Sequence, residues 1–75
     1  MILPAGIARV AIVGGGAVGV ELALCVSVWL KDNHRSASLD LYEAGPRILS
    51  EHRPKTVRLA ESQLTESGIR IYCNH

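Results

Sequence analysis

The feature that most constrains this chain is a short apolar run that ends in three spaced glycines. Residues 10–13 have the composition of a buried strand, and Gly14-x-Gly16-x-x-Gly19 follows directly, with a helical pattern starting inside it. A strand, a tight turn and a helix in this order bring free backbone N–H groups and the positive end of a helix dipole to one point. The pattern therefore predicts a turn that binds the pyrophosphate of a dinucleotide.

The glycines of this turn have separate tasks. Gly14 permits the sharp turn out of the strand, Gly16 leaves no Cβ where the phosphates approach, and Gly19 lets the helix pack closely on the sheet. The same glycines also occur in ordinary strand-to-helix turns that bind nothing, so the rest of the chain must decide between the two interpretations. The predicted contacts within the turn are Gly14, Gly15, Gly16, Ala17, Val18 and Gly19.

A carboxylate follows the second predicted strand. Residues 39–42 form another largely apolar run, and Glu43 comes next, 24 residues after Gly19. In dinucleotide-binding folds a carboxylate at the tip of the second strand, roughly 20 residues beyond the glycines, accepts hydrogen bonds from the adenosine ribose. The polar residues 31–36 lengthen the preceding loop and explain the larger spacing. The alternative is that Glu43 is a solvated residue at a strand end.

Strands and helices alternate along the whole chain. This alternation predicts an α/β fold, a partial Rossmann-type βαβαβ unit with a three-stranded parallel sheet in the order 3-2-1. We expect residues 1–8 to be a linker and residues 9–75 to be the dinucleotide-binding segment. The predicted strands are residues 9–14, 38–43 and 69–73, and the predicted helices are residues 17–31 and 54–67.

The first predicted helix is apolar around nearly its whole circumference. One face of a sheet can cover only one side of such a helix. We therefore expect this chain to be part of a larger protein that covers the other side, and self-association through the helix is the alternative. The apolar residues are Val18, Val20, Leu22, Ala23, Leu24, Cys25, Val26, Val28, Trp29 and Leu30.

Composition excludes several other classes of protein. The net charge is only +1, and no basic stripe indicates nucleic-acid binding. The longest uncharged apolar stretch, residues 22–30, is far shorter than the ~20 residues that cross a bilayer, and we expect no signal peptide before it. Cys25 and Cys73 form no CxxC pair and have no metal-ligand spacing with the histidines, so they predict buried thiols in a reducing cytoplasm and no metal site. No residue has the context of a nucleophile or proton donor.

Three stretches together resemble the pyridine-nucleotide-binding segment of the flavin-dependent pyridine nucleotide–disulfide oxidoreductases, with the NADH dehydrogenase-like branch favoured. They are residues 13–23, 41–49 and 64–71, and the first contains Glu21 within Gly-Val-Glu-Leu-Ala. The resemblance implies that FAD is bound by a part of the parent protein outside this chain, and that hydride passes to it from the nicotinamide. This chain alone is then not an active enzyme.

The resemblance also implies roles for individual residues. The glycines would form the pyrophosphate turn, with the N–H groups of Gly16, Ala17 and Val18 as donors, and Glu43 would accept hydrogen bonds from the ribose. Glu21 matches an acidic position near the junction of nicotinamide and flavin; the alternative is that it neutralises a lysine of the missing part.

The carboxylate of Glu43 favours NAD(H) over NADP(H), because it would repel a 2′-phosphate. Arg47 and Arg53 are the nearby cations, and we expect both to be solvated loop residues. Two other functions stay open. One is a non-catalytic fragment or packing module without nucleotide binding, and the other is an S-adenosylmethionine-binding fold, although that turn usually has glycine where Val18 stands. A phosphate-binding loop of the NTPase type is excluded, because Val20 rather than lysine follows Gly19.

Overall fold

The computed structural model describes residues 9–35 and 37–75, which form three strands and two helices. In chain order they are β1 (Arg9–Val13), α1 (Ala17–Asp32), β2 (Ser38–Tyr42), α2 (Pro54–Glu66) and β3 (Ile69–Tyr72). All five predicted elements are confirmed, and each end lies within one residue of the prediction. The linker predicted for residues 1–8 lies outside the described residues.

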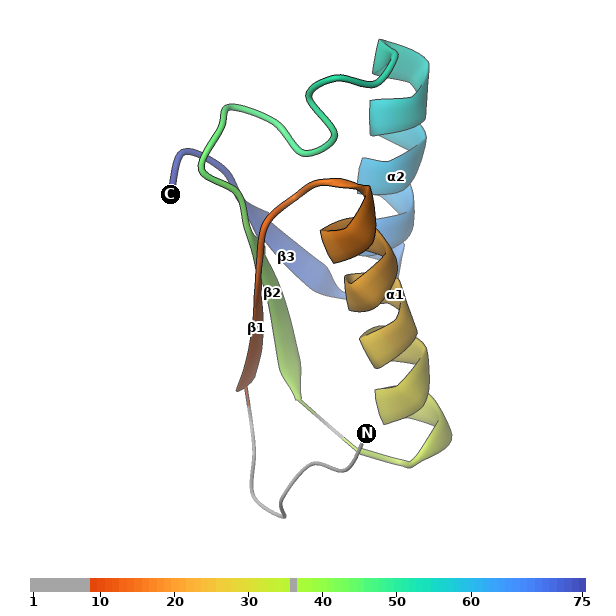
Figure 1. Ribbon diagram of the computed structural model, residues 1–75. Coiled ribbons are helices and arrows are strands. Elements are labelled where there is room, and N and C mark those ends of the chain that lie inside the picture. Colours follow the sequence, from red (N-terminus) through yellow and green to blue (C-terminus); the bar gives the residue numbers. More distant parts are fainter. Residues whose placement is uncertain (1–8, 36) are drawn as a thin grey trace.

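The sheet is parallel, with β2 between β1 and β3. The observed order β1-β2-β3 is the predicted order 3-2-1 read from the other edge. Val13 pairs with Tyr42, and Tyr42 pairs with Tyr72, so the three strands end at the same level. Both helices cover one face of the sheet (Figure 1). The fold is therefore the predicted α/β unit, and the loops that follow the strands meet at one edge.

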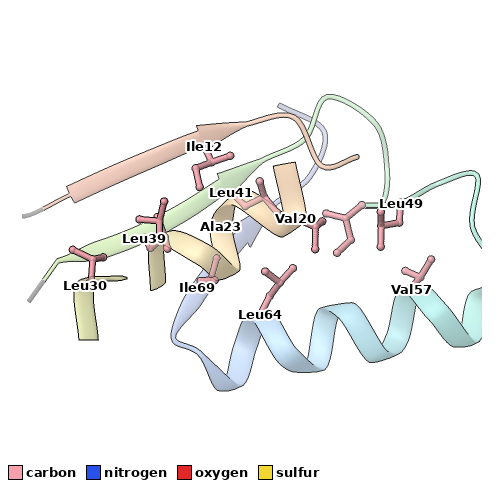
Figure 2. Close-up of a cluster of buried hydrophobic side chains, with 12 residues drawn as sticks. Ile12, Val20, Ala23, Leu30, Leu39, Leu41, Leu49, Val57, Leu64 and Ile69 are labelled. Atoms are coloured by element: carbon pink, nitrogen blue, oxygen red, sulfur yellow. The ribbon is translucent and has the colours of Figure 1, made fainter. Parts of the chain in front are cut away.

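The core lies between this face of the sheet and the two helices (Figure 2). Alternation along β2 directs Leu39 and Leu41 into the core, and Leu41 is completely buried. Pro54 begins α2, because its fixed φ suits the first helical turn. Gly68, with φ of +80°, ends the helix in a conformation that glycine adopts without strain. The remaining buried apolar residues are Ile12, Val20, Ala23, Val26, Leu30, Ile48, Leu49, Val57, Leu64 and Ile69.

The opposite face of the sheet contains a polar ladder. Asp40 points to this face, and its carboxylate is held between two arginines of the neighbouring strands. Arg70 Nε donates to Asp40 Oδ1 at 2.8 Å, and Arg9 Nη2 lies 3.5 Å from Oδ2. These bonds, chiefly the one from Arg70, hold the pKa of Asp40 below its usual value. At the carboxyl end of the same face, the Tyr42 and Tyr72 rings stack with their centroids 5.1 Å apart.

The two sides of α1 differ as the sequence predicts. Val20 and Val26 face the sheet and are buried, whereas Val18 and Val28 are 80% and 59% exposed. Cys25 lies on the exposed side and Cys73 is half-buried, so the prediction of two buried thiols is wrong. The exposure of Cys25 depends on the side of α1 on which it lies, rather than on the general tendency of cysteine to be buried.

No helix among the described residues is long and apolar enough to cross a membrane. The same residues contain no cluster of three or more His, Cys, Asp or Glu side chains that could hold a metal ion.

Candidate functional site

The turn between β1 and α1 needs its first glycine for backbone reasons. The Gly14 N–H donates to the Tyr42 carbonyl at 2.8 Å, which extends the sheet one residue beyond β1. Gly14 then takes a φ of +107°, a value that residues with a Cβ rarely adopt. The chain therefore turns sharply at the edge of the sheet, as the glycine pattern predicts.

The other two glycines of the pattern face different surroundings. A Cβ on Gly19 would lie 1.8 Å from the carbonyl oxygen of Gly14, so the first turn of α1 rests directly on the end of the strand. A Cβ on Gly16 would meet nothing within 4 Å. Gly16 thus presents bare backbone to an open space, while Gly19 packs against the Gly14 carbonyl within the turn.

The N-terminus of α1 offers free hydrogen-bond donors next to this open space. Gly16 is the N-cap residue, and the first bond of the helix runs from the Val20 N–H to the Gly16 carbonyl at 3.0 Å. No side chain caps the helix, and its first turn contains no acidic residue. No described residue accepts from the N–H groups of Gly16, Ala17 and Val18, so these groups can bond an external acceptor, and the helix dipole favours an anion there. The residues present fit the pyrophosphate of a dinucleotide.

Glu43 is fastened to this turn by both of its carboxylate oxygens. Oε1 accepts from the Gly15 N–H at 2.7 Å, and Oε2 accepts from the Gly45 N–H at 2.6 Å. These bonds, first that from Gly45 and then that from Gly15, lower the pKa of Glu43 below its usual value, so the group is ionised at neutral pH. Each oxygen retains another lone-pair direction for a hydroxyl donor. Glu43 is half-buried, and it is not a freely solvated strand-end residue.

The backbone around Glu43 is fixed as well. The Glu43 N–H donates to the Tyr72 carbonyl at 2.8 Å, and the Glu43 carbonyl accepts from the His75 N–H at 3.0 Å. The Asn74 N–H donates to the Gly45 carbonyl at 2.9 Å. The segment after β3 therefore supports the loop after β2.

Sequence reasoning missed the contribution of the loop between β2 and α2. Ile48 is completely buried, and the Leu49 N–H donates to the Gly15 carbonyl at 2.8 Å. The sequence does contain a sign of this contribution, because the aliphatic residues Ile48 and Leu49 stand together in the loop. They contribute to the sequence prediction only within the stretch 41–49 that carries the family resemblance. Both the N–H and the carbonyl of Gly15 are thus hydrogen-bonded within the chain.

The remaining predicted residues lie apart from this arrangement. Glu21 is exposed on α1, two residues beyond Gly19. Arg47 is an exposed loop residue, as the sequence predicts, and it forms an ion pair with Glu61 of α2 at 3.1 Å. Arg53 is exposed and precedes α2 as its N-cap residue.

Comparisons with known proteins agree with this geometry. The family model of the pyridine nucleotide-disulphide oxidoreductases matches residues 2–75. Two solved structures are similar, each with a TM-score of 0.73: a ferredoxin reductase for the CYP199A2 system from Rhodopseudomonas palustris, at 20% identity, and NDH2 from Plasmodium falciparum in complex with NADH, at 23% identity. The matches cover 89% and 88% of this chain. No curated protein sequence matches the chain.

The chain spans about 15% of the length of each of these two proteins. The family binds FAD and NAD(P)H, and the glycine turn and parallel sheet described above form a Rossmann-like, dinucleotide-binding region. Fold, turn and family model thus lead to one assignment: the chain belongs to the pyridine nucleotide-disulphide oxidoreductase family.

Proposed function

We propose that this chain binds NADH and presents it to a flavin held outside these 75 residues. The observation that carries the proposal is the open backbone at Gly16, next to the uncapped N-terminus of α1, with the Glu43 carboxylate fixed to the neighbouring Gly15. When bound, NADH supplies a hydride for reduction of the flavin.

The chain itself contributes binding and orientation. The N–H groups of Gly16, Ala17 and Val18 donate to the pyrophosphate, and the positive end of α1 stabilises its charge. The carboxylate of Glu43 accepts hydrogen bonds from the adenosine ribose through its remaining lone pairs. No described side chain needs to move a proton, because the reaction belongs to the cofactors. Glu21 stays a predicted contact near the nicotinamide.

The preference for NADH over NADPH follows from the charge at Glu43. Its carboxylate is ionised and has no proton to donate, so it repels a 2′-phosphate. Arg47, the loop arginine closest to Glu43 in the sequence, is bonded to Glu61 on α2. We expect Glu43→Arg to shift the ratio of NADH to NADPH affinity toward NADPH. An unchanged ratio would show that Glu43 does not contact the ribose.

The test of binding is a titration of the chain with NADH, followed by amide NMR shifts. We expect shifts centred on residues 14–19 and 43, and Gly16→Val should abolish them because its side chain fills the space that the phosphates need. Ser62→Val is the matched control, since it adds the same side chain at an exposed position of α2. Equal NADH affinity in Gly16→Val and wild type would refute the assignment.

A further inference from the structure

Gly15 is held from three directions by residues that lie 28 to 34 positions later in the chain. Its N–H donates to Glu43, and its carbonyl accepts from the Leu49 N–H at 2.8 Å. A Cβ on Gly15 would lie only 2.9 Å from Cγ2 of Ile48, so Ile48 fills the space beside it. We call Glu43, Ile48 and Leu49 the Gly15 clamp.

Leu49 occupies an unusual backbone conformation within this clamp. Its φ is +49°, in the left-handed region that disfavours residues with a Cβ. Two contacts keep it there: the side chain is buried in the core with Val20 and Val57 (Figure 2), and the Leu49 carbonyl accepts from the His52 N–H at 2.9 Å. A strained conformation persists only where the surroundings fix it. In this conformation the Leu49 N–H points at the Gly15 carbonyl.

We propose that Ile48 and Leu49 are positioning residues for the dinucleotide, although neither belongs to the glycine turn. This inference rests on the proposed function and extends it to the loop between β2 and α2. The clamp occupies both backbone groups of Gly15, so that the turn has one conformation and the N–H groups from Gly16 onward stay directed at the pyrophosphate. A turn that also adopted other conformations would bind the dinucleotide more weakly, because the apparent Kd rises as the fraction of molecules in the binding-competent conformation falls.

The test compares Leu49→Gly with Leu49→Ala. Both variants lose the buried side chain and keep the N–H, but only glycine adopts a φ of +49° without strain. If Leu49 acted through core packing alone, alanine would bind NADH as well as glycine or better. We expect the reverse order: Leu49→Gly within about twofold of the wild-type Kd, and Leu49→Ala weaker by about fivefold, the lower end of the left-handed penalty. Equal affinities, or tighter binding by Leu49→Ala, would overturn the proposal.

A second measurement uses the unmodified chain and does not depend on the variants folding. Because clamping and binding are linked, NADH should slow hydrogen exchange of the Leu49 amide. The Ser67 amide, bonded to the Gln63 carbonyl at the C-terminal end of α2, is the control and should be unaffected. Unchanged exchange at Leu49 with NADH bound would overturn the clamp while the proposed function stands. A wild-type chain that binds no NADH would overturn both, since the inference requires the site.

Discussion

Replacing Gly19 with alanine separates two effects that predict opposite changes in the free energy of unfolding. Gly19 is the third residue of α1, and alanine is the better helix former by about 1 kcal/mol. Helix propensity alone therefore predicts a more stable variant. The structure predicts the opposite, because the added Cβ would lie 1.8 Å from the Gly14 carbonyl oxygen and 2.9 Å from its carbonyl carbon.

The magnitude follows from the distance that must open. Contacts to a Cβ shorter than 3.0 Å are essentially never seen, so the strand end and the helix must separate by roughly 1.2 Å. Overpacking of this kind costs about 1–3 kcal/mol, and the upper end applies because both contacting atoms belong to the backbone. After the gain in helix propensity, we expect Gly19→Ala to lose about 2 kcal/mol of unfolding free energy.

Thermal unfolding followed by circular dichroism is the assay. For a domain of this size the loss corresponds to a melting temperature lower by roughly 8–16 °C. Gly16→Ala is the control: its Cβ meets nothing within 4 Å, so it should lose no more than about 1 kcal/mol as a poorer N-cap. A Gly19→Ala variant as stable as wild type would refute the packing argument.

Three further changes test other parts of the structure. Gly14→Ala has space for its Cβ but a φ of +107°, so it should destabilise the chain by about 1–3 kcal/mol in chemical denaturation, and an unchanged midpoint would contradict the strain. The pKa values of Asp40 and Glu43 are lowered by folding, so their stabilisation is complete at neutral pH and is lost as the pH falls below their usual values of 3.8 and 4.5. The melting temperature of Asp40→Asn should therefore fall less than that of wild type between roughly pH 5 and pH 2. An equal fall in the two proteins would show that the pairing with Arg70 contributes little. Glu43→Gln should weaken NADH binding in calorimetry, because its amide nitrogen cannot accept from either Gly15 or Gly45, and undiminished binding would contradict this role.

The fold was predictable because its boundaries are marked by residues with a local physical effect. Pro54 and Gly68 delimit α2 through their backbone preferences, and the spacing of Gly14 and Gly19 identifies the turn. The position of Glu43 beside the glycine turn was predictable because it directly follows a strand whose end must lie at the edge of the parallel sheet. These inferences need only neighbouring residues.

The contacts that fix the site were not predictable, because they depend on where distant segments meet. Nothing in the sequence indicates that Leu49 adopts a left-handed conformation, since that state results from burial of its side chain. The exposure of Cys25 depends on which side of α1 the sheet covers. The place of Asp40 between two arginines likewise requires the register of all three strands, which pairs Asp40 with Arg70 and places Arg9 opposite Ser38, two residues before Asp40.

The two bonds that Glu43 makes to backbone N–H groups would also lower the entropic cost of its proposed contact with the ribose. A glutamate on a protein surface samples many rotamers and loses that freedom when it binds a ligand. Here the loss has already occurred on folding, because Oε1 and Oε2 are both fixed before any nucleotide arrives. A carboxylate fixed in this way cannot rotate aside to accommodate an additional phosphate. Discrimination at the ribose would then reflect rigidity as much as charge, with little entropic cost to the protein on binding.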